Sequence, residues 1–128
     1  MIRMEHAALY VRDLERAKAF FTDWFQAAAG PKYHNPRTGF QSYFLTFGEG
    51  ARLEIMTKPE LLDAAKEPER TGYAHAAFSV GSREAVDDLT ARLKEAGYSV
   101  VSGPRTTGDG YYESCILDQE DNRIEITV

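Results

Sequence analysis

Two short segments of this chain recur about 70 residues apart, and this repeat constrains the fold more than any other feature. One pair is HAALYV and HAAFSV, which open with His6 and His75; the other is RLEI and RIEI, which contain Glu54 and Glu125. The histidines are 69 residues apart and the glutamates 71, so both pairs belong to one duplication. This period is too long for a solenoid unit and predicts two copies of one supersecondary module.

The hydrophobic spacing of the first copy predicts a strand, a helix and two further strands. MEHAALYV has strand composition, and Asp13 is a suitable N-cap for the segment that follows. Apolar residues at spacings of three and four predict a helix over 14–28, which Gly30 and Pro31 should end. QSYFLTF and RLEIM follow as strands, with room for a further short strand near Tyr33.

The second copy repeats this order. HAAFSV is predicted to be a strand, Ser82 to cap a helix and Gly97 to close it. YSVVSGP, YYESCILD and RIEITV supply three more strands. The predicted fold is therefore α+β, with two tandem βαβββ modules in a single domain over 1–128. We expect module one at about 1–57, a connector rich in proline and charge at about 58–72, and module two at about 73–128.

Composition excludes several classes of partner. The net charge is −5 and no run is rich in lysine and arginine, so we expect no binding to nucleic acid. No apolar run approaches the roughly 20 residues of a membrane-spanning helix, so no membrane association is expected. Cys115 is the only cysteine, which rules out an internal disulfide, and a signal-peptide pattern is absent. We therefore expect a cytoplasmic protein with Cys115 as a small buried hydrophobe.

The repeated histidines and glutamates form a candidate metal site. Side chains alternate between the faces of a strand, so in each copy the histidine and the glutamate fall on the face opposite the apolar one. Imidazole and carboxylate suit nickel, zinc, cobalt, manganese or iron, and burying two carboxylates is costly without a cation. Each residue alone is better explained as an ordinary core histidine or strand glutamate, but the repeated set favours a metal. The predicted ligands are His6, Glu54, His75 and Glu125.

Four segments resemble the vicinal oxygen chelate superfamily: MEHAALYVRDLERAKAFF, RLEIM, YAHAAFSVGSREAVDDL and LDQEDNRIEITV. That superfamily includes glyoxalase I, extradiol dioxygenases, fosfomycin-resistance thiol transferases and bleomycin-binding proteins. The resemblance implies a curved mixed sheet around a metal cleft, one divalent metal per site and a homodimer. It places the four candidate ligands on the metal positions of glyoxalase I, which isomerises the hemithioacetal of a 2-oxoaldehyde and a thiol. Glu125 would be the principal base and Glu54 its partner.

The resemblance leaves two alternatives to a glyoxalase I-like lyase. One is a metal-free protein that binds a small antibiotic or toxin, and the other is an extradiol-type dioxygenase or thiol transferase. One departure bears on the substrate. Relatives that use glutathione usually carry an arginine and an asparagine where Tyr10 and Lys58 stand or nearby. We therefore predict poor activity with glutathione and a different thiol or small oxygenated molecule as the substrate.

Overall fold

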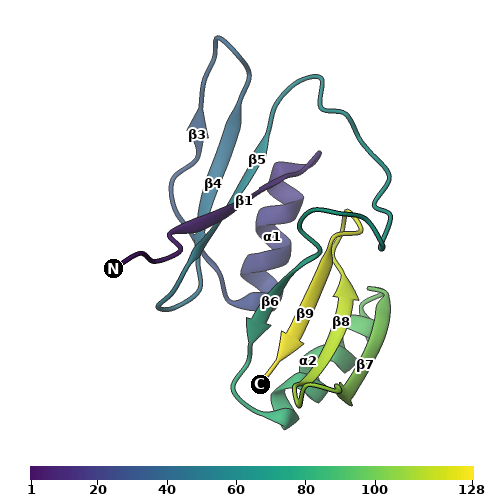
Figure 1. Cartoon of the computed structure of the whole chain (residues 1–128). Helices are drawn as coiled ribbons and strands as arrows, with labels where there is room; N and C mark the ends of the chain where they lie inside the picture. The colour runs from purple at the N-terminus through teal and green to yellow at the C-terminus, as the bar shows by residue number, and fades with distance from the viewer. The chain divides into compact units, whose positions relative to one another are not determined.

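The computed structural model describes all residues 1–128, and the chain divides into two compact units, Met1–Ala64 and Ala65–Val128 (Figure 1). The boundary falls within the predicted connector. Each unit contains one long helix and one β-sheet, as the α+β prediction requires.

The sheet of the first unit is mixed. Its strands follow the order β1-β5-β4-β2, and β3 also pairs with β4. The first strand and the last, β1 and β5, are parallel, whereas the other pairs are antiparallel. The elements are β1 (His6–Tyr10), α1 (Leu14–Phe25), β2 (Ala28–Ala29), β3 (Tyr33–His34), β4 (Gln41–Thr46) and β5 (Arg52–Thr57).

Helix α1 begins where the sequence predicts and ends earlier. The Asp13 side chain accepts a hydrogen bond from the Arg16 amide at 3.0 Å, which confirms it as the N-cap. The predicted end at residue 28 is wrong, because Gln26 adopts a left-handed conformation with φ of 56° and the Ala27 amide bonds to the Phe21 carbonyl. The chain then enters β2, which pairs with β4 and was not predicted.

The second unit repeats this plan with a four-stranded sheet in the order β6-β9-β8-β7. Its first and last strands, β6 and β9, are again parallel. Ser82 caps the helix by accepting from the Ala85 amide at 3.1 Å, and Gly97 follows its end with φ of 98°, as predicted. The elements are β6 (His75–Ser79), α2 (Arg83–Glu95), β7 (Val100–Thr106), β8 (Tyr112–Leu117) and β9 (Arg123–Thr127).

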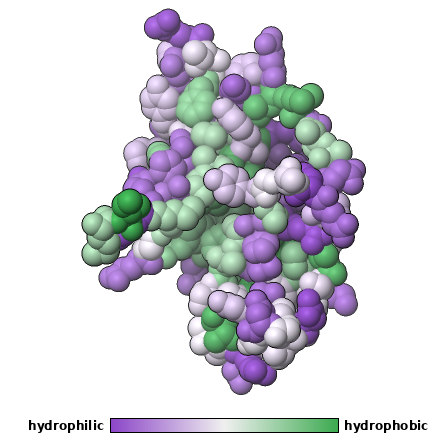
Figure 2. Space-filling model, in the orientation of Figure 1, coloured by the Kyte–Doolittle hydropathy of each residue, from purple (hydrophilic) through white to green (hydrophobic).

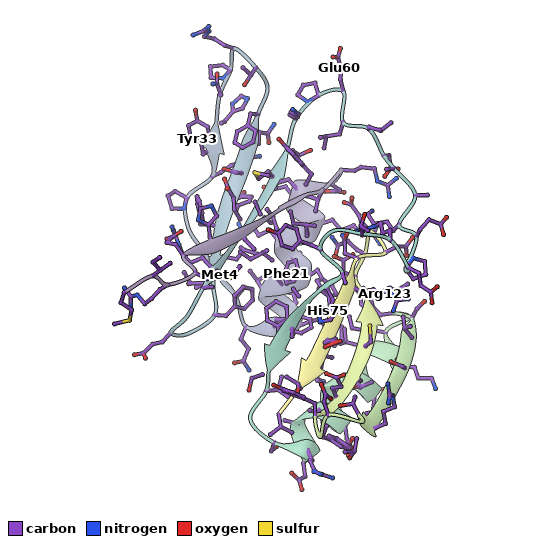
Figure 3. All side chains as sticks on the ribbon, viewed as in Figure 1. Met4, Phe21, Tyr33, Glu60, His75 and Arg123 are labelled. Atoms are coloured by element: carbon purple, nitrogen blue, oxygen red, sulfur yellow. The ribbon has the colours of Figure 1, made fainter.

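In each unit the helix packs on one face of the sheet. Phe21 of α1, labelled in Figure 3, is fully buried. Its ring contacts the rings of Phe20, Phe25 and Phe47. In the second unit the hydroxyls of Thr90 on α2 and Ser114 on β8 form a buried hydrogen bond of 2.7 Å. The opposite face of each sheet carries the polar strand residues, so the helix determines which face is available for a site.

The surface is mostly mixed in polarity. Both hydrophilic and apolar side chains are exposed on the face shown in Figure 2. An exception is the N-terminal segment, where Met1, Ile2 and Met4 are exposed. Neither helix has the length and apolar character needed to cross a membrane.

Candidate metal centre

The first half of the candidate site lies on the face of the first sheet that points away from α1. Ala8 is the register partner of Glu54, which places His6 and Glu54 on the same face, two residues apart along the strand direction. The His6 Nε2 lies 3.8 Å from the Glu54 Oε1. The Phe44 ring and the imidazole are nearly perpendicular, with ring centroids 5.2 Å apart. The parallel pairing of β1 and β5 therefore creates the contact between the histidine and the glutamate.

The second half of the site has the same construction. Ala77 is the register partner of Glu125, so His75 and Glu125 share a face of the second sheet. The His75 Nε2 lies 3.2 Å from the Glu125 Oε2. Figure 3 marks His75 on β6 and Arg123 on the neighbouring β9. The duplication seen in the sequence is therefore also a duplication of side-chain geometry.

The surroundings of the two glutamates are suited to a bound cation. Their side chains are only 16% exposed at Glu54 and 20% at Glu125, and neither forms an ion pair with a lysine or arginine. The ion-pair partner of each glutamate is a histidine. A largely covered carboxylate without a fixed cation is costly, and imidazole with carboxylate is a suitable donor set for a divalent transition metal.

The structure brings the predicted ligands together as two pairs. His6 lies with Glu54 in the first unit, and His75 lies with Glu125 in the second. No group of three or more histidine, cysteine, aspartate or glutamate side chains is arranged to hold a metal ion. The complete four-ligand site therefore remains a prediction.

Glu5 is a neighbour of the first pair that sequence reasoning missed. Its carboxylate contacts the His6 Nδ1 and also pairs with the Arg52 guanidinium. These hydrogen bonds, that of His6 first, lower the pKa of Glu5. The second copy has Ala74 at this position, so comparison of the two copies gave no signal.

Glu113 is a neighbour of the second pair that was also missed. Cys115 is the register partner of Glu125, so Glu113 and Cys115 lie on the candidate face of β8. Burial, followed by a hydrogen bond with Glu125, raises the pKa of Glu113. The alternation in YESCIL could have placed Glu113 on this face, but the first copy has Ser42 at the matching register. Cys115 is buried as expected, and burial raises the pKa of its thiol.

Tyr10 and Lys58 lie together near the C-terminal ends of β1 and β5. Tyr10 is on the same face as His6 and is 47% exposed. The Lys58 ammonium lies 5.4 Å from the centroid of the Tyr10 ring, within cation–π range. Arg52 is already engaged by Glu5 and lies over the Phe44 ring at 4.1 Å. Of these two cations, Arg52 is therefore held by an acidic side chain and Lys58 by an aromatic ring.

Comparison with known families identifies the superfamily of this chain. A family model described as the Glyoxalase/Bleomycin resistance protein/Dioxygenase superfamily matches residues 3–126. The chain belongs to this superfamily. The predicted resemblance to the vicinal oxygen chelate proteins is thus confirmed. A curated relative, the uncharacterized protein YqjT of Bacillus subtilis (strain 168), is 29% identical over 96% of each chain.

Solved structures of the superfamily share the fold at low sequence identity. The trypanothione-dependent glyoxalase I of Leishmania major superposes with a TM-score of 0.79 at 21% identity, over 99% of this chain and 86% of that one. The fosfomycin resistance protein FosX of Listeria monocytogenes, complexed with Mn(II) and sulfate, gives a TM-score of 0.73 at 22% identity, over 100% and 93% of the two chains. The glyoxalase-like fold predicted from the sequence is confirmed.

Proposed function

We propose that this chain is a metal-dependent lyase or isomerase of the glyoxalase I type. Its substrate would be a small molecule with two vicinal oxygens, such as the hemithioacetal of a 2-oxoaldehyde and a thiol. The observation that carries the proposal is the duplicated pair of one histidine and one largely covered glutamate, at 3.8 Å in the first unit and 3.2 Å in the second. Superfamily membership supports this class of chemistry, although one fold can serve several reactions.

One divalent cation would be bound by four residues together, namely His6, Glu54, His75 and Glu125. The candidates are nickel, zinc, cobalt, manganese and iron, since all accept imidazole nitrogen and carboxylate oxygen. The Mn(II) complex of FosX supports a divalent ion in a protein of this fold. When bound, the cation would polarise both substrate oxygens and stabilise the negative charge that develops on them.

Glu125 would act as the principal base. One of its carboxylate oxygens would take the proton from the substrate carbon that bears the sulfur and return it to the neighbouring carbonyl carbon. The hydroxyl proton would move between the two oxygens, so a hemithioacetal becomes a 2-hydroxy thioester with no net change in atoms or electrons. Glu54, at the equivalent position of the first unit, is proposed as its partner.

Metal content is the experiment that tests this function. We expect purified wild-type protein to hold about one divalent ion per site, and His75→Ala and Glu125→Gln to lose most of it, because each removes one of four ligands. Metal analysis by mass spectrometry measures the difference. His34→Ala is the matched control, since His34 is an exposed histidine on β3 outside the candidate site. Sedimentation should show the wild type and each variant as a homodimer of the 14.4 kDa chain.

A well-folded wild type that holds no metal, even after incubation with the five candidate ions, would contradict the proposal. It would favour the metal-free binding protein for an antibiotic or toxin. Oxygen consumption with a catechol would instead indicate a dioxygenase.

The thiol should not be glutathione. Tyr10 offers no fixed cation for a glutathione carboxylate, an interaction worth on the order of 1 to 3 kcal/mol. Tyr10→Arg should therefore raise kcat/KM on the glutathione hemithioacetal by about 5- to 150-fold. The assay is a panel of methylglyoxal premixed with glutathione, trypanothione or other small thiols, with nickel-, cobalt- and zinc-loaded protein. Tyr73→Arg is the control, since Tyr73 is 95% exposed and lies in the segment before β6, in the other unit.

The specificity argument fails if the wild type already turns over the glutathione adduct efficiently. A kcat/KM on the order of 10⁵ per molar per second or more would be such a result. Activity with another thiol alone would support the assignment of Tyr10.

A further inference from the structure

Glu5 is an acidic residue outside the predicted ligand set, and its side chain contacts the Nδ1 of His6. The Glu5 carboxylate contacts the His6 Nδ1 with one oxygen and the Arg52 guanidinium with the other. The backbone of Glu5 is fixed as well, because the Arg52 amide donates to the Glu5 carbonyl at 3.0 Å. Glu5 is thus held by its main chain and by its side chain, although it precedes the first residue of β1.

This arrangement selects one tautomer of His6. A carboxylate can only accept, so the Nδ1 next to Glu5 carries the proton when the ring is neutral. The other nitrogen, Nε2, then keeps its lone pair. That nitrogen is the one that faces Glu54, at 3.8 Å from its Oε1. The ring is therefore prepared to bind a cation through Nε2 before any cation arrives.

The second unit lacks this arrangement, although the rest of the half-site is repeated. The residue before His75 is Ala74, and the His75 Nδ1 has no hydrogen-bond partner. The His75 Nε2 lies 3.2 Å from the Glu125 Oε2, so the nearest carboxylate favours a proton on Nε2 over one on Nδ1 in the metal-free protein. Arg123 is the register partner of His75, as Arg52 is of His6. Because residue 74 is alanine, Arg123 has no carboxylate in the position of Glu5 with which to form an ion pair.

We propose that Glu5, held by Arg52, is a positioning residue that fixes His6 with Nδ1 protonated and Nε2 free, and that this makes His6 the preorganised histidine of the site. A histidine that binds a metal usually donates its other N–H to a carboxylate, carbonyl or water, and loss of that partner typically costs about 10- to 100-fold in metal affinity. The part of this inference that concerns metal affinity rests on the proposed function. The part that concerns the tautomer does not.

The tautomer is measured first, in metal-free protein with ¹⁵N-labelled histidine at about pH 8.5, about two units above the pKa of histidine in model peptides. Long-range ¹H–¹⁵N correlation spectra distinguish the two ring nitrogens. We expect His6 to carry its proton on Nδ1 and His75 on Nε2. In Glu5→Ala the His6 preference should be lost, whereas Glu5→Gln, which keeps an acceptor oxygen, should retain part of it. A wild-type His6 with its proton on Nε2 would overturn the inference.

Metal affinity is measured next, by titration of the same proteins with zinc or nickel against a chelator of known affinity. Glu5→Ala should raise the Kd by about 10- to 100-fold, with a smaller rise for Glu5→Gln. Glu49→Ala is the matched control, since Glu49 is an exposed glutamate in the turn after β4. An unchanged Kd in both Glu5 variants would overturn the inference. A wild type that binds no metal would instead contradict the proposed function, while the tautomer of His6 would still test Glu5.

A transplant of the same arrangement into the second unit gives a gain-of-function test. Ala74 occupies the position equivalent to Glu5, and Arg123 is placed as Arg52 is. Ala74→Glu should therefore shift the proton of His75 from Nε2 to Nδ1, in competition with Glu125. A clear shift supports the inference. The inference is contradicted if the tautomer of His75 does not change in Ala74→Glu and the tautomer of His6 does not change in Glu5→Ala.

Discussion

Replacement of Glu125 by glutamine is expected to lower kcat by about 10²- to 10⁴-fold on the thiol adduct that the wild type turns over fastest. Glutamine occupies nearly the same volume but cannot accept the proton that leaves the substrate carbon. The effect should persist at saturating metal, which separates the loss of the base from the loss of a ligand. Steady-state kinetics with protein titrated to full metal occupancy make this measurement.

Glu54→Gln is the matched control for this experiment. Glu54 occupies the same place in the first copy and is covered to a similar extent. If Glu125 is the principal base, Glu54→Gln should lower kcat less at saturating metal. A larger loss in Glu54→Gln than in Glu125→Gln would reverse the two roles. Equal, small losses in both would contradict base catalysis by either glutamate.

Phe21→Ala is expected to destabilise the protein by about 3 to 5 kcal/mol. Phe21 is fully buried, and three neighbouring rings surround the volume that the substitution would leave empty. Chemical denaturation followed by circular dichroism measures the change in the free energy of unfolding. The face that carries the candidate ligands lies on the other side of the sheet, so under the proposed function folded Phe21→Ala should bind metal as the wild type does.

Leu62→Ala is the control for the stability measurement, since Leu62 is 90% exposed. It should change the free energy of unfolding by less than about 0.5 kcal/mol. A loss below about 1 kcal/mol for Phe21→Ala would show that the aromatic cluster of α1 does not hold the helix on its sheet.

Features that depend on alternation or on the repeat could be predicted from the sequence. His6 and Glu54 share a face because strand side chains alternate and β1 pairs with β5, and the second copy supplied independent support for both assignments. The caps at Asp13 and Ser82 were predictable because each side chain accepts a hydrogen bond from an amide three residues further along the chain, in its own helix. Local signals of this kind need no knowledge of the tertiary structure.

Features that depend on contacts formed only in the tertiary structure could not be predicted. Helix α1 ends early because Gln26 takes a left-handed conformation and the next residues pair with β4, and neither event has a local signal in AAAG. Glu5 acquires its role from Arg52, 47 residues along the chain, and Glu113 acquires its role from Glu125 on the adjacent strand β9. Both are absent from the other copy, so the repeat, which identified the four candidate ligands, could not identify them.

The two residues of each half-site come from the first and the last strand of their unit. His6 and Glu54 are 48 residues apart in the chain and meet only once β1 and β5 have paired. A nascent chain cannot form this half-site until β5 has been synthesised and has joined the sheet. A cation bound there would tie the two ends of the unit together, and at 100 times its Kd it would stabilise the folded state by about 2.7 kcal/mol. Metal loading would thus follow folding in time and then protect the completed protein from unfolding.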